Sequence, residues 1–225
     1  REVPHNLGSV PGCIIIKSLT DAGYGWRVYH ESLGATKFLA LDSTNTEADA
    51  VTANMWNSTE PTASVFTLGN HITVNSTSSS TYVAYLFASD DARFGDNSNE
   101  SIIKCGSFTN DSASVGVEVN LGWEPQWLLI KGSSSGSGLG NWVLIDNMRG
   151  ASVDSQQRLY ANATTAEGSS NWFKFTSRGF TPNTTFGGTL VYIAIRRPMK
   201  TPEAGTEVFA IDTMGSTGDG NLPAF

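Results

Sequence analysis

The sequence predicts an all-β protein built from two related antiparallel β-sandwich units, with little helix. Three observations support this fold class: short apolar runs bounded by turn residues, an order of segments that occurs twice along the chain, and a composition suited to turns. Charged residues make up only 16% of the sequence, and 23 of the 225 residues are glycine. Such a composition is typical of β proteins with many turns rather than of helices covered by salt bridges.

The clearest predicted strand lies in residues 122–131, Gly-Trp-Glu-Pro-Gln-Trp-Leu-Leu-Ile-Lys. Pro125 fixes φ and lacks an N–H donor, so it suits the beginning of a strand rather than its middle. The apolar run that follows is long enough for a strand covered on both faces and too short for a helix. The same pattern of a proline, an apolar run and a lysine occurs at residues 10–17. Pro11 matches Pro125, and Lys17 matches Lys131, both at an offset of 114 residues.

Further matches between the two halves predict the domain organisation. Residues 142–146 match residues 26–30, and residues 192–194 match residues 82–84, with offsets that change only inside loops rich in Gly, Ser, Thr and Asn. Loops absorb insertions more readily than strands, so two diverged copies are predicted. The predicted parts are a first β module in residues 1–88, a connecting segment with two strands in residues 89–121, a second β module in residues 122–200, and a linker with the start of a further strand or module in residues 201–225.

The remaining elements follow in chain order. Residues 1–9 are predicted to be a linker, and residues 47–55 carry a weak helical pattern that Thr and Val oppose. Gly69-Asn70 is a candidate hairpin turn between strands at residues 63–67 and 71–74. Further strands are predicted at residues 13–17, 26–30, 38–41, 81–87, 101–108, 115–121, 127–130, 142–146 and 206–212. Because the chain starts at arginine and ends without a natural finish, we expect a piece of a longer chain.

Composition and charge argue against several classes of protein. The net charge is −7 and the cations are not clustered, so nucleic acid is not expected as a partner. No run of about 18 apolar residues is present, so no membrane insertion is predicted. The two cysteines, Cys13 and Cys105, lie beside apolar strands and are interpreted as small buried core residues rather than as a disulfide bridge.

No pattern of histidine, serine or glycine predicts catalysis, a metal or a cofactor. His5, His30 and His71 lack metal-ligand spacing. The Gly-rich loop at residues 133–140 lacks the Gly-Lys-Ser/Thr ending of a phosphate loop. No Gly-x-Ser-x-Gly elbow leads into a helix. The protein is therefore predicted not to be an enzyme.

The carboxylates give the same result. Asp146, Asp154 and Glu167 do not single out the pair that a glycoside hydrolase needs. The acidic loop at residues 90–100 offers oxygen ligands but does not follow the twelve-residue calcium-loop pattern. We interpret it as a solvated loop, with calcium binding as the alternative.

The six tryptophans are the main candidates for recognition, because aromatic rings stack on the faces of sugars. Trp26 and Trp142 recur at equivalent positions and Trp127 lies in the apolar run, as core residues do. Trp56 and Trp172 instead lie in stretches rich in Asn and Ser and are the better candidates for the surface. The predicted ligand-contact residues are Trp56, Asn57, Tyr24, Trp172 and Asn171, in or near the divergent loops at residues 20–24, 54–61, 133–140 and 167–171.

The second copy carries a fixed order of short motifs. These are residues 122–131, Trp-x-apolar-x-Asp at 142–146, Arg-Gly at 149–150, Leu-x-x-Asn at 159–162 followed by Glu167, Gly-Phe-Thr at 179–181, and Tyr-apolar-Ala at 192–194. This order resembles repeated modules of virion structural proteins of marine tailed bacteriophages, often in tail-fibre-like or other host-facing proteins. The first copy departs from the pattern, since Leu33 stands in place of Arg149 and His30 in place of Asp146.

The resemblance implies a non-enzymatic virion structural protein on the surface of the extracellular particle: a tail fibre, a spike or a capsid-surface component that contacts the host. It implies other virion proteins as partners, a homo-oligomer, for which a trimer is usual in fibres, and host cell-surface glycan. It supplies no catalytic residue. The alternative is a lectin-like carbohydrate-binding module outside a virion, and a virion-attached depolymerase is a third interpretation.

Overall fold

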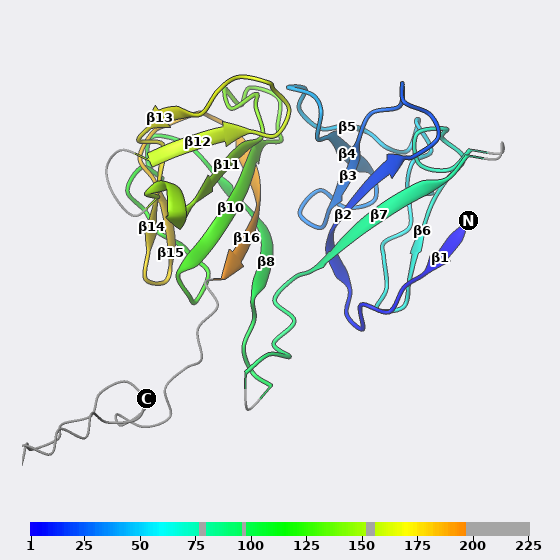
Figure 1. Ribbon diagram of the computed structural model, residues 1–225, viewed down its shortest axis with the longest axis horizontal. Helices are drawn as coiled ribbons and strands as arrows, with labels where there is room; N and C mark the ends of the chain where they lie inside the picture. The colour runs from blue at the N-terminus through cyan, green and yellow to red at the C-terminus, as the bar shows by residue number, and fades with distance from the viewer. Residues whose placement is uncertain (77–79, 96–97, 152–155, 197–225) are drawn as a thin grey trace, which may run out of the picture.

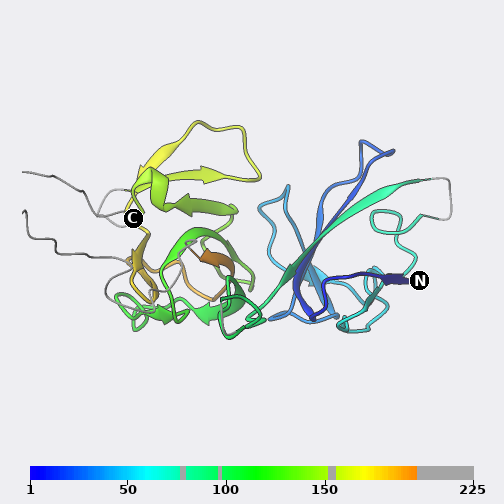
Figure 2. The same cartoon turned by 60° about the horizontal axis from the view of Figure 1, so that its bottom comes forward.

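The computed structural model describes residues 1–76, 80–95, 98–151 and 156–196, and the strand predicted at residues 206–212 lies outside them. The described residues form sixteen β-strands, one short 3₁₀ helix and no α-helix, which confirms the all-β class. The strands are arranged in four sheets. Figure 1 and Figure 2 show two bodies side by side, one made from strands β1 to β7 and the other from β8 to β16.

The first unit packs a five-stranded sheet against a two-stranded one. The large sheet has the order β5-β4-β3-β2-β7, and the small sheet pairs β1 with β6. An apolar cluster that includes Ile14, Tyr29 and Phe66 fills the space between them. The strands are β1 (Glu2–Pro4), β2 (Pro11–Ser18), β3 (Arg27–His30), β4 (Lys37–Ala40), β5 (Ala48–Asp49), β6 (Val65–Thr67) and β7 (Tyr82–Ala88).

The second unit repeats this arrangement with more strands. Its large sheet has the order β13-β12-β11-β10-β16-β8, and its small sheet the order β14-β15-β9. The connecting segment thus supplies β8 and β9 to the second unit. The elements are β8 (Ile103–Thr109), β9 (Val119–Asn120), β10 (Pro125–Gly132), β11 (Val143–Asp146), η1 (Asn147–Arg149), β12 (Gln156–Tyr160), β13 (Gly168–Ser170), β14 (Phe173–Thr176), β15 (Gly179–Pro182) and β16 (Thr189–Arg196).

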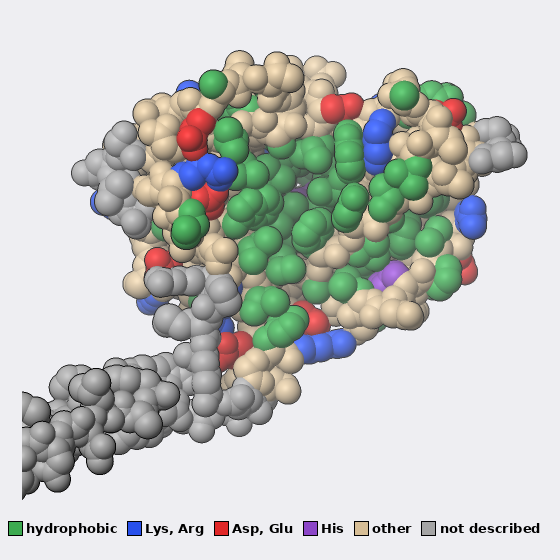
Figure 3. Space-filling model, in the orientation of Figure 1, with side chains coloured by type: hydrophobic (Ala, Val, Ile, Leu, Met, Phe, Trp, Pro, Cys, Tyr) green, Lys and Arg blue, Asp and Glu red, His purple; other side chains and the backbone are tan. Residues whose placement is uncertain are grey.

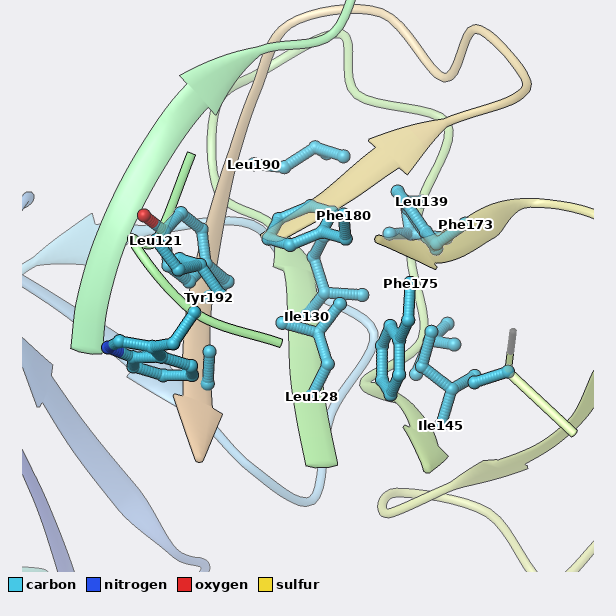
Figure 4. Close-up of a cluster of buried hydrophobic side chains, with 14 residues drawn as sticks. Leu121, Leu128, Ile130, Leu139, Ile145, Phe173, Phe175, Phe180, Leu190 and Tyr192 are labelled. Carbon is cyan, nitrogen blue, oxygen red and sulfur yellow. The ribbon is translucent and has the colours of Figure 1, made fainter. Parts of the chain in front are cut away.

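Strand β10 is buried on both faces, as its sequence predicts. Successive side chains of a strand point to opposite faces. Leu128 and Ile130 therefore join the core of the second unit, where Figure 4 shows them beside Phe175 and Phe180. Leu129 points the other way, into a third apolar cluster that both units share. The two large sheets thus pack against each other through the faces that their own small sheets leave uncovered.

The central pairings of the two large sheets share one register. Cys13 lies opposite His30, and Trp127 lies opposite Asp146, as the sequence match predicts. Both β2 and β10 pair irregularly directly after their first proline. Ser18 and Gly132 are equivalent positions at the offset of 114. Ser18 lies opposite Tyr82, and Gly132 lies opposite Leu190. Strands β7 and β16 are therefore equivalent at an offset of 108 residues, whereas the sequence match gave 110. The two large sheets share this much of their register, and the duplication stays a prediction.

Several local predictions are wrong, all in segments where pairing is short or distant. Residues 1–9 contain β1, whose partner β6 lies about sixty residues further along the chain. Residues 71–74 form a turn, so Gly69-Asn70 does not connect a hairpin. Residues 47–55 hold the two-residue strand β5 and turns in place of a helix, and residues 115–121 hold only the two residues of β9.

Candidate functional site

Trp56 is a core residue, and the prediction that it lies at the surface is wrong. Its side chain is 2% exposed, and its indole N–H donates to the carbonyl oxygen of Lys37 at 2.9 Å. Its ring meets Tyr29 edge to face, with the centroids 5.9 Å apart. An indole enclosed in this way presents no face to a ligand. The neighbouring Asn57 is exposed, in a turn where its φ is 52°.

Trp172 and Asn171 lie in the second unit, beside strand β14. Trp172 is half-buried, and the guanidinium carbon of Arg158 lies 4.2 Å from its ring centroid. The ring also meets Phe186 edge to face, with centroids 5.2 Å apart. Asn171 is exposed, and its side-chain oxygen accepts a hydrogen bond from Asn183 at 2.8 Å. One face of the Trp172 ring therefore already has a cationic partner.

The five predicted contact residues do not form one site. Tyr24 is half-buried in the loop after β2, where its backbone N–H donates to the carbonyl oxygen of Asp21 at 3.1 Å. Among the described residues, no hydrogen bond or ring contact joins Tyr24, Trp56 and Trp172. The role of Tyr24, Asn57, Trp172 and Asn171 in ligand contact remains a prediction.

The motif residues Asp146, Arg149, Gly150 and Glu167 build a corner of the second unit. Asp146 caps η1 by accepting the backbone N–H of Arg149 at 2.9 Å, and it also pairs with the Arg149 guanidinium. Arg149 Nε lies 2.8 Å from a carboxylate oxygen of Glu167. Gly150 ends the helix with φ of 85°, a conformation that glycine adopts without strain. The motif therefore fixes a turn of the chain.

His30, which stands at the Asp146 position of the first unit, joins the two units. It is 1% exposed, its Nδ1 accepts from the backbone N–H of Ser32 at 3.2 Å, and its Nε2 lies 3.0 Å from the carbonyl oxygen of Tyr192. Since Nδ1 accepts, Nε2 carries the proton and donates it to that carbonyl. Burial lowers the pKa of His30 to about 4, so the ring is neutral at pH 7.

The cluster that both units share is the main contact between them. We call it the shared core, and its buried members are Cys13, Ile15, Val28, Leu39, Cys105, Leu129, Trp142, Val191 and Ile193. Three further hydrogen bonds cross between the units: Trp142 Nε1 to Ala40 O at 2.8 Å, Lys131 Nζ to Thr44 O at 2.9 Å, and Glu47 N to Ser133 O at 2.8 Å. Apolar burial and directed bonds together fix how the two sheets pack.

The shared core continues onto the surface of the molecule. Tyr85 lies opposite Ile15 and Leu144 opposite Leu129, so both point to the side of their sheet that packs in the shared core. Tyr85 is 50% exposed, and its ring stacks on Trp26 with centroids 6.2 Å apart. Figure 3 shows hydrophobic side chains gathered across the middle of one side of the molecule, over both units, with charged side chains at the margin. Tyr85 is the exposed member of the surface that we call the open apolar face, and its partly buried members are Trp26, Phe87, Ile103, Trp127 and Leu144.

The described residues contain no group of three or more His, Cys, Asp or Glu side chains that could hold a metal ion. Both cysteines are free and buried, as predicted, and burial raises the pKa of each thiol well above its ordinary value. The described part of the acidic loop uses its carboxylates in ion pairs, Asp90 with Lys104 and Glu100 with Arg196. Asp154, one of the carboxylates considered for glycoside hydrolysis, lies outside the described residues.

The fold defines the chain as an all-β protein of two packed sandwich-like units, with partly exposed apolar side chains across both. The chain belongs to a family described as a domain of unknown function (DUF7483), whose pattern matches residues 1–196. No curated protein and no solved structure matches the chain. Within the described residues, no helix is long and apolar enough to cross a membrane.

Sequence reasoning missed the open apolar face, although a signal for it was present. Strand β7 reads Tyr-Val-Ala-Tyr-Leu-Phe-Ala, an apolar run that indicates burial on both faces. Tyr85 within it is half exposed, which shows that one face of the strand is only partly covered. A run with apolar residues on both faces predicts two apolar surfaces, but it does not say what covers each one.

Proposed function

We propose that the protein is a non-enzymatic structural module of a bacteriophage particle, in a fibre, a spike or the capsid surface, and that it assembles through the open apolar face. The half-exposed Tyr85, set among partly buried apolar side chains of both units, carries the proposal. Monomeric soluble proteins rarely expose a large contiguous apolar area, and such areas mark interaction sites. An apolar centre with a charged margin is also the usual anatomy of a protein interface.

The occupant that the structure favours is a second copy of this chain. The open apolar face continues the surface through which the two large sheets already pack against each other. In each large sheet, the apolar side chains that pack against the other large sheet are therefore followed by further apolar side chains that are only partly buried. Two copies can bring these surfaces together in the isologous way that symmetric oligomers use.

Assembly is tested by the mass of the protein in solution. We expect sedimentation equilibrium of the wild-type chain to give at least twice the monomer mass of 24.0 kDa. Tyr85→Lys places a charge in the face and should give a monomer, because an unpaired charge is costly to bury. Val51→Lys is the matched control, since Val51 is 51% exposed and lies outside the face. A monomeric wild type, or equal masses for both variants, would rule out this interface.

The particle assignment is supported by the motif residues. Those that resemble phage modules form the corner at Asp146 and contribute Trp142 to the shared core, so the resemblance concerns residues that determine the fold. Mass spectrometry and immunogold labelling of purified particles of the phage that encodes the chain test this assignment. We expect the chain in the particles in fixed stoichiometry and labelled at one location. Its absence from washed particles would contradict the proposal.

The alternative function is a lectin-like module outside a virion, which the half-buried Trp172 favours. A ring next to Arg158 at the surface offers an edge for a sugar and a donor for its hydroxyl groups. Loss of glycan binding in Trp172→Ala, with an unchanged melting temperature, would favour this alternative. Release of reducing sugar from a host polysaccharide would instead indicate an enzyme.

A further inference from the structure

A polar pocket of about 430 Å³ lies in the first unit, between the loop after β2 and the segment from β4 to β5, and the chain neighbours of Tyr24, Gly23 and Gly25, line it. Its volume is in the range of small-ligand sites. Both backbone and side chains line it, and the lining residues that matter here are Gly23, Gly25, Arg27, Phe38, Asp42 and Asn45.

Arg27 and Asp42 give the pocket its chemistry. The Arg27 side chain is 20% exposed, its guanidinium carbon lies 5.8 Å from the centroid of the Phe38 ring, and its Nη1 is 3.9 Å from Asp42 Oδ1. Arg27 Nε is buried and has no hydrogen-bond partner among the described residues. Its Nη1 donates to the backbone carbonyl oxygen of Trp26 at 3.3 Å, which anchors the guanidinium at the edge of the pocket. The Asp42 carboxylate is 44% exposed and offers hydrogen-bond acceptors to the pocket.

The wall opposite the glycine loop is held in place by the second unit. Three of the hydrogen bonds that cross between the units reach this wall, at Ala40, Thr44 and Glu47. Within the first unit, the backbone N–H of Leu41 donates to the carbonyl oxygen of Trp26 at 3.2 Å. A wall fixed at several points loses little conformational freedom when a ligand binds.

We infer that this pocket binds a neutral sugar unit. Arg27 and Asp42 balance in charge, so an anion would gain Arg27 but meet the Asp42 carboxylate at close range. The guanidinium, the carboxylate and the Asn45 amide are planar groups with paired donors or acceptors, which suits neighbouring hydroxyl groups on a sugar ring. Phe38 adds apolar surface for the C–H face of the ring. This ligand site goes beyond the proposed assembly role and would exist equally outside a particle.

Two glycines offer a matched pair of variants. A Cβ on Gly25 would lie 2.3 Å from Asp42 Oδ2 and 2.8 Å from Arg27 Nη1, so Gly25→Ala must displace both polar side chains. A Cβ on Gly23 would meet nothing within 4 Å. Neither glycine has a left-handed φ, so alanine fits the backbone at both positions. Asp42→Asn is a third variant, which keeps the shape and removes the charge.

The test is binding of the full chain to an array of neutral and acidic mono- and oligosaccharides, followed by titration calorimetry with the best sugar. We expect binding to a neutral sugar, weakened at least about tenfold in Gly25→Ala and in Asp42→Asn and unchanged in Gly23→Ala, with thermal unfolding confirming that each variant is folded. No binding, binding restricted to acidic sugars, or equal affinity in all four proteins would overturn the inference. Loss of binding in Trp172→Ala alone would place the sugar site elsewhere. The oligomeric state reports separately on the assembly proposal.

Discussion

At the residue scale, His30 couples the fold to pH because the shared core holds it neutral. Nδ1 of the ring accepts from the backbone N–H of Ser32, and Nε2 donates to the carbonyl oxygen of Tyr192. A second proton would have to bind to Nδ1, where it would face the N–H of Ser32 and find no hydrogen-bond acceptor. Its folded-state pKa of about 4 lies below the 6.5 of an ordinary histidine. Between these values the unfolded chain binds a proton that the folded chain does not. The resulting stability is complete above pH 6.5 and is lost as the pH falls toward 4.

We therefore expect the free energy of unfolding to decrease by about 3 kcal/mol from this group alone between pH 6.5 and pH 4. Urea unfolding at a series of pH values, with His30→Gln as reference, measures the effect. Glutamine does not titrate, so the difference between the two proteins isolates His30 from carboxylates that titrate in the same range. Parallel pH profiles for the two proteins would show that His30 is not held neutral.

The two strand-ending lysines, Lys17 and Lys131, have unequal roles despite their equivalent positions. Lys131 is fully buried, and its ammonium donates to the carbonyl oxygens of Thr44 and Gly140. Lys17 is half-buried and donates to the carbonyl oxygen of Tyr24 in its own loop. We expect Lys131→Met to destabilise the fold by about 1–3 kcal/mol, because it leaves two carbonyls of the inter-unit contact unpaired.

Lys17→Met is the control, with an expected loss below about 1 kcal/mol because Lys17 is only half-buried and its bond stays within its own loop. Urea midpoints of the two variants give the comparison. Equal losses would mean that the bond to Thr44 contributes nothing to holding the units together.

At the element scale, the corner of the second unit depends on the cap of η1. Asp146 is 8% exposed and satisfies both the backbone and the guanidinium of Arg149. We expect Asp146→Ala to cost about 1–2 kcal/mol of stability, as the loss of a helix cap does. Glu167→Ala should cost less than about 1 kcal/mol, since that carboxylate is 43% exposed and its ion pair is screened. Thermal unfolding of both variants tests the ranking, and a larger effect at Glu167 would contradict it.

The long strands could be predicted from the sequence, whereas the short ones could not. β2 and β10 can be recognised in the sequence because both faces of each strand are buried, which gives a continuous apolar run, and because a proline marks the start of each strand. β1, β5 and β9 have only two or three residues, and β1 and β9 also pair with strands about sixty residues away. Periodicity needs more residues than that to give a signal. The position of β6 was nearly correct, but its hairpin partner was wrong, because distant pairing with β1 replaced the local turn.

At the scale of the whole molecule, neither surface proposed for binding could be derived from sequence. The burial of Trp56 depends on Tyr29 and on the backbone of Lys37, which come from other strands. The open apolar face depends on how far the two large sheets overlap, and no local pattern encodes that. The pocket at Arg27 likewise needs its wall to be held by the second unit.

The shared core also determines how the molecule unfolds. If either unit unfolds, the other must expose its half of this core, which includes Cys13 and Ile15 from one unit and Leu129 and Val191 from the other. Three hydrogen bonds and the His30 contact would break at the same time. Exposing that much apolar surface makes a half-folded molecule unfavourable. We therefore expect differential scanning calorimetry of the full chain to show a single transition.

Trp142→Ala tests whether the shared core is responsible for that cooperativity. The indole is 1% exposed, packs in the shared core and donates to Ala40 across the contact, so its removal should cost about 3–5 kcal/mol. We expect the transition to move to lower temperature and to divide in two, since the units lose a large buried side chain and a hydrogen bond between them. Phe173→Ala, in the core of the second unit alone, should destabilise by a similar amount but leave one transition. Two transitions in the wild type would show that the units fold independently and that the shared core is only a docking contact.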